Sequence, residues 1–208
     1  EHGADSRADS DADFRLYETH WTSRPHGDGI FAEHSLDGLT VGVQGDPSEH
    51  VQALMRALKQ RGANATFTPF GEAVASPVDL LLLVPSFQAP AGPIEAHGDL
   101  ATNLVGALDA QASIDSQPHT LLVYNAEDYR ARAATALMRC VDAEWGHRRA
   151  KACGFDPAMP TETIADHALR EWCSSDSTVD VRFKAALRLV QSFNQASQDN
   201  AKEIEIGR

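Results

Sequence analysis

The stretch VGVQGDPSEHVQALMRALKQRGA, residues 41–63, decides the fold. The start of this stretch belongs to an apolar segment, Gly38 to Gly45, which predicts a buried strand. Pro47 to Arg61 predict an amphipathic helix, because Pro and Ser suit a helix start and apolar residues then recur at helical spacing. Gly62 closes the segment. Strand, turn and helix in this order predict the first unit of a parallel α/β sheet.

Strand and helix patterns alternate along the rest of the chain. Strands are predicted at 65–70, 78–84, 120–124, 150–155 and 203–206, helices at 99–111, 127–145 and 165–172, and an amphipathic segment at 181–193. The apolar run at 78–84 is typical of a central parallel strand covered on both faces. The pattern therefore predicts an α/β fold with a doubly wound parallel sheet.

Composition restricts the function classes. A chain of 208 residues can form one good core, and its net charge of −12 argues against binding to nucleic acid or to an anionic membrane surface. No run of about 18 apolar residues predicts a transmembrane helix. The three cysteines lack Cys-x-x-Cys spacing, and the nine histidines are scattered. We therefore expect a reduced, cytoplasmic protein without a metal site.

The first 37 residues differ from the remainder. They are polar and acidic, with low hydrophobicity, which predicts little order in isolation. The same stretch contains Phe14, Leu16, Tyr17 and Trp21, so it is either a flexible extension or an arm that docks onto the body or a partner. The expected organisation is an N-terminal arm, residues 1–37, and a single domain, residues 38–208.

Several short stretches occur in a definite order along the chain. They are Ser35-Leu36-Asp37-Gly38-Leu39, Val78-Asp79-Leu80-Leu81-Leu82, Thr102-Asn103-Leu104-Val105-Gly106, Asp142-Ala143-Glu144-Trp145-Gly146, Phe155-Asp156-Pro157-Ala158 and Lys202-Glu203-Ile204-Glu205-Ile206-Gly207. From about Leu36 to the C-terminus their order and spacing resemble the short-chain dehydrogenase/reductase (SDR) family. The resemblance implies a Rossmann-like sheet that binds NAD(P), and Asn103 matches the family's structural asparagine.

The cofactor loop departs from the family pattern Gly-x-x-x-Gly-x-Gly. Counted from Gly45, the second and third glycines are replaced by Glu49 and Val51. These glycines let the pyrophosphate approach the backbone and let helix and strand pack closely. A carboxylate about 4 Å from the phosphate would cost roughly 4 kcal/mol at an effective dielectric constant near 20. We therefore expect no cofactor binding by this degenerate loop; the alternative is a strand, turn and helix that never bound a nucleotide.

The connection after the second predicted strand is also too short for the family. Only about seven residues, Gly71 to Pro77, precede the strand at 78–84, and fully extended they reach about 24 Å. The family places a helix, a strand and another helix there, beside the adenine. The sequence therefore predicts a shortened sheet without this unit.

The catalytic Tyr-x-x-x-Lys pair of the family is absent. No tyrosine is followed by lysine at this offset, and no lysine occurs between Lys59 and Lys151. Such a lysine lowers the pKa of the tyrosine for proton transfer. General acid–base catalysis of this kind accelerates a reaction about a hundredfold to ten-thousandfold. Of the family's catalytic residues only Asn103 remains.

Other residues offer weaker candidates. Tyr129 and Arg132, with Asp128 and His97, could form displaced catalytic groups, although a solvated helix face is the simpler interpretation. A cluster of Trp145, His147, Arg148, Arg149 and Lys151 could hold an acidic partner or a CoA phosphate; the alternative is an ordinary helix C-terminus that attracts cations.

The resemblance and its departures lead to one expected function. We expect a catalytically inactive SDR-like subunit, without a cofactor of its own, that pairs with an active, NAD(P)-dependent SDR paralogue in a heterodimer or heterotetramer. It would be a structural or regulatory subunit of an oxidoreductase complex. Two alternatives remain open: a small-molecule or acyl-CoA binding module that uses the vacated crevice, and an SDR-fold enzyme with relocated catalytic residues.

Overall fold

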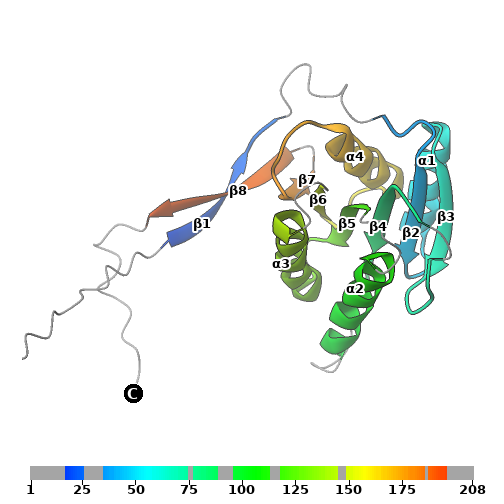
Figure 1. Cartoon of the computed structure of the whole chain (residues 1–208). Helices are drawn as coiled ribbons and strands as arrows, with labels where there is room; N and C mark the ends of the chain where they lie inside the picture. Colours follow the sequence, from blue (N-terminus) through cyan, green and yellow to red (C-terminus); the bar gives the residue numbers. More distant parts are fainter. Residues whose placement is uncertain are drawn as a thin grey trace, which may run out of the picture. The chain divides into compact units, whose positions relative to one another are not determined.

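The computed structural model describes residues 17–25, 35–74, 77–88, 96–112, 118–144, 149–185 and 187–195. The strands are β1 (Tyr17–Ser23), β2 (Thr40–Gly45), β3 (Asn64–Pro69), β4 (Leu80–Val84), β5 (His119–Asn125), β6 (Ala150–Phe155), β7 (Asp180–Lys184) and β8 (Leu187–Gln195). The helices are α1 (Glu49–Gln60), α2 (Ala96–Ala112), α3 (Tyr129–Glu144) and α4 (Thr161–Cys173) (Figure 1). The chain divides into two units, one of residues Ser23–Val190 and one of the two chain ends, Glu1–Thr22 with Gln191–Arg208.

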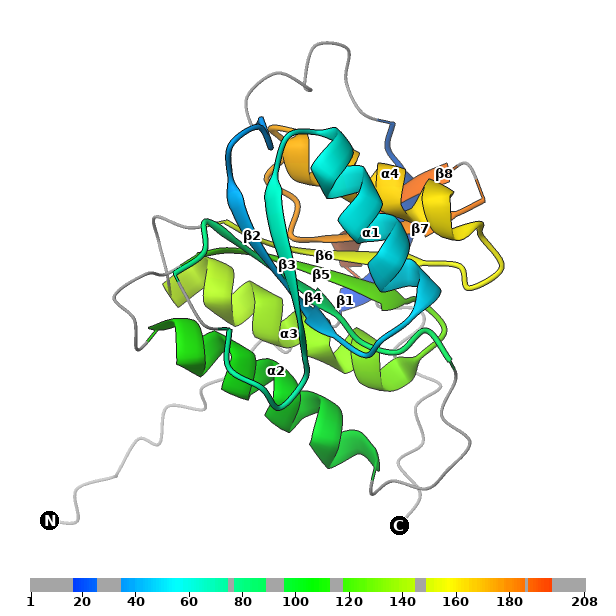
Figure 2. The same cartoon turned by 90° about the vertical axis from the view of Figure 1, so that its right-hand side faces the viewer.

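The strands form a mostly parallel sheet in the order β1-β8-β7-β6-β5-β4-β2-β3. Strands β3, β2, β4, β5, β6 and β7 run parallel to one another, and β8 returns antiparallel to β7. Helices α1 and α4 cover one face of this sheet, and α2 and α3 cover the other (Figure 2). The predicted α/β fold with a Rossmann-like doubly wound sheet is confirmed.

The apolar strand β4 belongs to both layers of the core. Leu80, Leu82 and Val84 face the core under α1 and α4, whereas Leu81 and Leu83 face the core under α2 and α3. All five side chains are fully buried. Because successive side chains of a strand point to opposite faces, a strand covered on both faces must be apolar throughout.

The sheet lacks the expected adenine-side unit. β3 stands at the edge, and the next strand, β4, lies on the other side of β2. Figure 2 shows the connection that follows β3 passing beside α2. Nine residues between Phe70 and Leu80 cannot hold two helices and a strand, since even one average strand takes about five. The prediction of a shortened sheet is confirmed.

The end of the sheet differs from the expectation. The sequence predicts an amphipathic segment at 181–193, and in the structure this segment forms the hairpin β7–β8. Val181, Phe183 and Val190 are buried and belong to one core, which is the period-2 pattern of strands. Ala185, with a φ of 52°, lies at the turn. The expected strand at 203–206 falls outside the described residues.

The unit of the chain ends contains most of β1 and the outer part of β8. These strands are neighbours in the sheet, and the Ser192 hydroxyl donates to the carbonyl oxygen of His20 at 3.3 Å. A strand therefore lies within the stretch 1–37 that was expected to be an arm. Across the described residues, no helix combines the length and apolar character needed to cross a bilayer.

Candidate functional site

The candidate site is the crevice at the carboxyl ends of β2 and β4. Ligands of doubly wound sheets bind where the strand order reverses, and here β3 and β4 lie on opposite sides of β2. Two loops border the crevice: Asp46 to Ser48 after β2, and Pro85 to Phe87 after β4. The amide of Ser86 donates to the Asp46 carboxylate at 3.0 Å, so the loops are joined to each other.

Gly45, the one glycine of the loop pattern that is retained, has a structural role. β2 and β4 pair with Gly45 opposite Val84. A Cβ atom at position 45 would lie 2.1 Å from the carbonyl oxygen of Val84, far inside van der Waals contact. Glycine is therefore required here by the close approach of two central strands, independently of any ligand.

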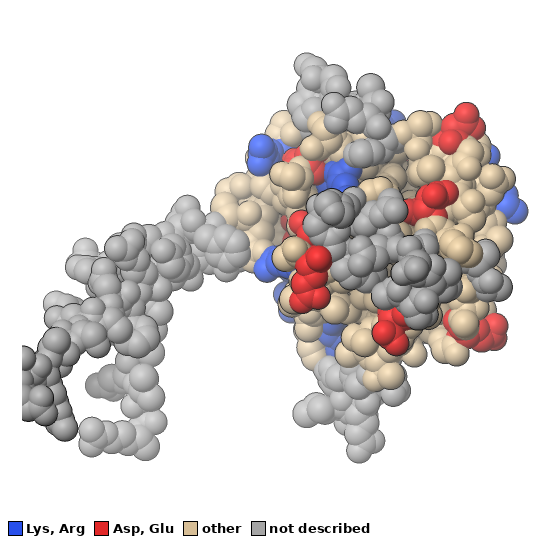
Figure 3. Space-filling view, viewed as in Figure 1, with Lys and Arg blue, Asp and Glu red and all other residues tan. Residues whose placement is uncertain are grey.

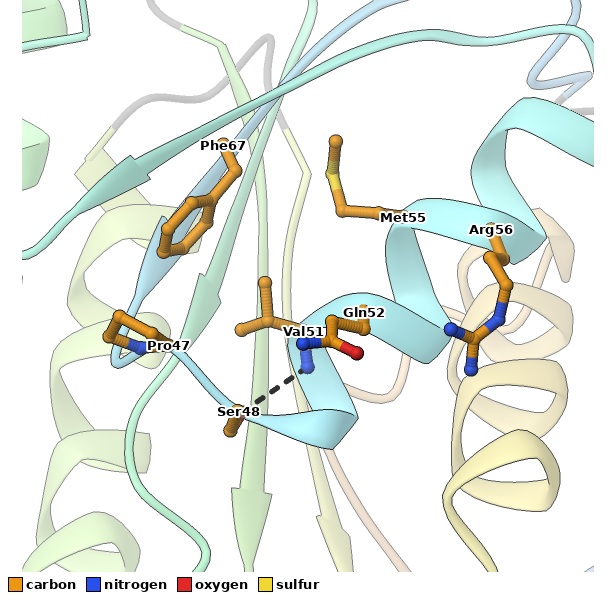
Figure 4. A pocket seen from close by; sticks show the side chains of 7 residues that line it. All are labelled: Pro47, Ser48, Val51, Gln52, Met55, Arg56 and Phe67. Atoms are coloured by element: carbon orange, nitrogen blue, oxygen red, sulfur yellow. Dashed lines mark hydrogen bonds between the residues drawn. The ribbon is translucent and has the colours of Figure 1, made fainter.

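The start of α1 does not fit a pyrophosphate. The Ser48 hydroxyl caps the helix by accepting from the amide of Val51 at 3.3 Å, as the dashed line in Figure 4 shows. Glu49 is exposed in the first turn, where its carboxylate repels an anion. The side chain of Val51 is 4% exposed and packs in the core. At the start of α1 one amide is therefore taken by the Ser48 cap, and a carboxylate and a buried valine replace the two glycines of the loop pattern.

Two aromatic rings of the chain itself pack at this crevice. His50, in the first turn of α1, stacks on Phe87 from the loop after β4, with centroids 3.9 Å apart and an interplanar angle of 11°. Phe87 is buried at 7% exposure, and its carbonyl oxygen accepts from the Asn125 amide at 2.9 Å. Burial lowers the pKa of His50 despite the opposing charge of Glu49, so its imidazole is neutral near pH 7. The loop after β4 is thus held against the start of α1 and the end of β5.

A shallow groove of about 370 Å³ lies beside this crevice, between α1 and the edge strand β3. In Figure 4 the side chains of Met55 and Phe67 flank it, and Arg56 projects from the next part of α1. Arg56 is engaged with Glu162 of α4. The groove is mainly apolar and lies beside β3, the last strand at this end of the sheet.

The candidate catalytic residues lie on different elements. Asn103 is half-buried on α2 and lines a pocket that includes neither Tyr129 nor Arg132. Tyr129, 52% exposed, and Arg132, also exposed, lie on α3. The buried Asp128 accepts from both the amide and the guanidinium of Arg130. Burial alone would raise the pKa of Asp128, but the bonds from Arg130 lower it, which keeps it an ionised structural group.

Part of the positive cluster expected from the sequence is buried and hydrogen-bonded in the structure. Lys151 is 1% exposed inside β6 and pairs with the buried Glu171 of α4. Arg149 donates to the carbonyl oxygens of Trp172 and Asp176 at 2.8 and 2.6 Å. On the described part of the face in Figure 3, basic side chains lie apart from one another. The side chains of Trp145, His147 and Arg148 fall outside the described residues, as does that of His97.

A buried ionic network is the feature that sequence reasoning missed. Arg188 of β8 donates to both carboxylate oxygens of Glu171, at 2.7 and 2.9 Å, and to Asp176 at 2.8 Å. It also donates to the carbonyl oxygen of Arg24 at 3.0 Å. A signal was present in the sequence, because Lys151 interrupts an otherwise apolar strand and a charged residue there requires a partner.

Comparisons with solved structures identify the fold. An N-terminal ketoreductase from the macrolactin assembly line matches with a TM-score of 0.68 and 13% identity, over 88% of this chain and 45% of that one. A keto acid-selecting NRPS module with adenylation, ketoreductase and pseudo Asub domains matches with a TM-score of 0.65 and 11% identity, over 88% of this chain and 19% of that one. A Serratia marcescens short-chain dehydrogenase/reductase mutant matches at 0.53 and 12%, over 74% of this chain and 99% of that one.

The chain has the fold of the short-chain dehydrogenases and reductases. At these identities the likeness is one of fold. This chain spans less than half the length of the two ketoreductase-containing chains. No protein-family profile and no curated protein matches the sequence. The comparisons therefore show the fold of this chain and not its activity.

Proposed function

We propose that this chain is a non-catalytic SDR-fold unit that packs against an active, NAD(P)-dependent reductase in a ketoreductase-type assembly. The active partner, a separate SDR paralogue in a heterodimer or heterotetramer, supplies the cofactor site and the catalytic residues. The unit described here supports the partner's structure or shapes its active site. This function belongs to an oxidoreductase complex in the cytoplasm.

The observation that carries the proposal is the stack of His50 on Phe87 at the cofactor position. Phe87 is part of the buried core, so moving it aside to admit a dinucleotide would expose apolar surface. Glu49 and Val51 add charge and bulk at the same place. A sheet that keeps the SDR order while its crevice is filled supports a role in assembly rather than in catalysis.

The lengths of the matching proteins agree with this proposal. This chain matches under half of the ketoreductase from the macrolactin assembly line and of the first ketoreductase of the tylosin PKS, over 45% and 41% of those chains. A unit equivalent to part of such a reductase leaves room for a second, catalytic part. The family resemblance implies association through the two long helices, which correspond to α2 and α3.

The outer surface of α2 and α3 is suited to such an association. An apolar groove of about 250 Å³ runs between the two helices and is lined by Leu100, Ala101, Leu104, Val105, Arg130, Ala133, Ala134 and Leu137. Val105 is 52% exposed at this groove. Burying apolar side chains of this kind against a partner stabilises a complex by about 25 cal/mol for each Å².

Affinity capture of the tagged chain from native lysate, followed by native mass spectrometry, tests the pairing. We expect a stoichiometric complex that contains an SDR-fold reductase and has NAD(P)H-dependent ketone-reducing activity. Recovery of the chain only as a monomer or homo-oligomer would contradict the proposal.

A pair of variants locates the interface. Val105→Asp places a charge in the groove between α2 and α3 and should abolish capture of the reductase. Gln52→Asp adds the same charge at an exposed position of α1, on the other face of the sheet, and should leave capture unchanged. Equal capture by both variants would exclude the α2–α3 surface as the interface.

The two alternatives receive less support. Tyr129 and Arg132 do not share a pocket with Asn103, and Asp128 is occupied by Arg130. An acyl-CoA module would need the crevice that His50 and Phe87 occupy. Turnover of NAD(P)H by the isolated chain, lost in Tyr129→Phe, would favour the relocated enzyme over the non-catalytic unit.

A further inference from the structure

The outer edge of β3 is an open end of the sheet. Within the described part of the chain β3 ends the strand order, and no strand lies beyond it. Figure 2 looks onto this end of the sheet, with β3 in front of the other strands. An open edge carries unpaired N–H and C=O groups that can pair with a strand of another chain. Charged side chains commonly prevent such pairing, and β3, with the sequence NATFTP, contains none.

Two residues of β3 present their backbone groups to this open edge. The amides of Asn64 and Phe70 donate to β2, at 2.8 and 3.2 Å. Because successive residues of a strand turn their backbone groups to opposite sides, the residues between them that face outward are Ala65, Phe67 and Pro69. Pro69 has no N–H group. The usable part of the edge is therefore Ala65 and Phe67.

The segment Ala65-Thr66-Phe67 is complementary to a second copy of itself. When two copies are antiparallel and centred on Thr66, Ala65 of each lies opposite Phe67 of the other, and each such pair exchanges two backbone hydrogen bonds. A small side chain then meets a large ring on the side of the sheet that packs against α1, where both residues are half-buried. The two exposed Thr66 side chains meet on the other side, which is a favourable cross-strand pair.

The charges of α1 favour the same antiparallel arrangement. Arg56 is ion-paired with Glu162, whereas Glu49 in the first turn and Lys59 in the last turn are exposed and form no ion pair among the described residues. The helix runs back between the parallel strands β2 and β3, so Lys59 lies toward the start of β3 and Glu49 toward its end. Two antiparallel copies bring the acidic end of each α1 toward the basic end of the other. Such electrostatic complementarity fixes the register of an interface.

The shallow groove between α1 and β3 supplies apolar surface beside the paired strands. Met55 and Phe67 flank this groove, and both pack only partly against the core (Figure 4). A second copy placed along β3 brings the same two side chains to the open side of the groove. Their burial adds an apolar contribution to the backbone hydrogen bonds.

We propose that the edge of β3 pairs antiparallel with β3 of a second copy of this chain, with the two Thr66 residues at the two-fold axis. This contact is separate from the α2–α3 surface and does not depend on pairing with a reductase. Together the two contacts give a heterotetramer with two copies of this chain at its centre.

Sedimentation equilibrium of the purified chain over a range of concentrations tests this contact. We expect one chain per particle at about 1 µM and an approach to two at about 200 µM, since a small interface gives micromolar affinity. In the ¹⁵N-labelled protein, dilution should shift the amides of Ala65 and Phe67 but not that of Leu121, in the central strand β5. A chain that stays monomeric at about 200 µM would overturn the proposal.

A charge-pair rescue places Thr66 at the axis. Thr66→Lys sets two like charges opposite each other and should weaken the dimer by about fivefold or more, as should Thr66→Glu. An equimolar mixture of these two variants should form a heterodimer at least as strong as the unchanged homodimer. Gln88→Lys adds the same charge at an exposed position away from β3, and should leave the dimer unchanged. Thr66 is exposed, so both of its variants should melt as folded proteins. Absence of rescue in the mixture would contradict the two-fold pairing.

Other outcomes would assign these surfaces differently. A dimer that persists in Thr66→Lys but is lost in Val105→Asp would place the contact between copies on the α2–α3 surface and overturn the proposal. Loss of reductase capture in Thr66→Lys, with a chain that is monomeric alone, would assign the β3 edge to the reductase. We expect Thr66→Lys to lose the dimer and keep reductase capture, so the failure of either contact is measured separately.

Discussion

The imidazole of His50 lies flat against the ring of Phe87, with the two centroids 3.9 Å apart. This contact joins the first turn of α1 to the loop after β4, which are the two elements that hold a dinucleotide in a doubly wound sheet. In this chain the first turn of α1 and the loop after β4 pack against each other. This packing at the start of α1 is the observation on which the proposed non-catalytic role rests.

Removing the ring tests how much this contact stabilises the fold. Phe87→Ala should lower the free energy of unfolding by about 3 kcal/mol, since a buried phenylalanine is lost and a cavity remains. Urea unfolding measures the change, with the exposed neighbour in Gln88→Ala as the control. Equal stability of the two variants would mean that the ring is not part of the core.

The structural role of Gly45 predicts a large effect from one methyl group. In Gly45→Ala the new Cβ atom would overlap the carbonyl oxygen of Val84. This variant should therefore lose about 1–3 kcal/mol of stability, the typical cost of overpacking. Gly106→Ala is the control: it should stabilise α2 by about 0.5–1 kcal/mol, because alanine favours a helix and the space is open. Thermal unfolding of both variants distinguishes them. A stable Gly45→Ala protein would disprove the close approach of β2 and β4.

The buried ionic network predicts an order of effects. Arg188→Met removes the two-point hydrogen bond to Glu171 and the ion pair with Asp176, and should cost about 3–5 kcal/mol. Lys151→Met should cost less, because Glu171 keeps two hydrogen bonds from Arg188. Chemical denaturation gives both values. The reverse order would show that Lys151, and not Arg188, is the centre of the network.

The lowered pKa of Asp176 predicts that the folded protein loses stability in acid. Burial alone would raise its pKa, but hydrogen bonds from Thr178 and the charge of Arg188 bring it well below the ordinary value of about 3.9. The ionised form therefore stabilises the fold above about pH 4, and this contribution is lost as the pH falls below it. Unfolding free energies at pH 5 and pH 3 should differ less for Asp176→Asn than for the unchanged chain. The exposed Glu162→Gln serves as the control, and an equal difference in all three proteins would exclude Asp176 as a source of the acid effect.

The order of the central elements could be predicted from the sequence because each has a strong local signal. The sequence predicts the strand at 150–155 with its observed bounds, and the apolar run at 78–84 predicts β4. The missing unit followed from the length of one connection. These inferences depend on the length of one connection and on the spacing of apolar residues, and both can be read directly from the sequence.

The parts that could not be predicted depend on partners distant in the chain. The segment 181–193 has apolar spacing that suits either a helix or a strand, and pairing with β6 decides for the strand. Lys151 was grouped with surface cations, because nothing nearby in the sequence points to Glu171. The contact of His50 with Phe87 joins two loops that meet only once the sheet has formed.

Equilibrium titration of the purified chain with NADPH and NADH tests the central claim most directly. Isothermal calorimetry at concentrations up to about 1 mM, at which a complex of ordinary cofactor affinity would saturate, should give no binding heat for either nucleotide. Saturable binding of one nucleotide per chain, lost when Gly45 or Phe87 is replaced by a larger side chain, would place a working cofactor site in the crevice and contradict the account.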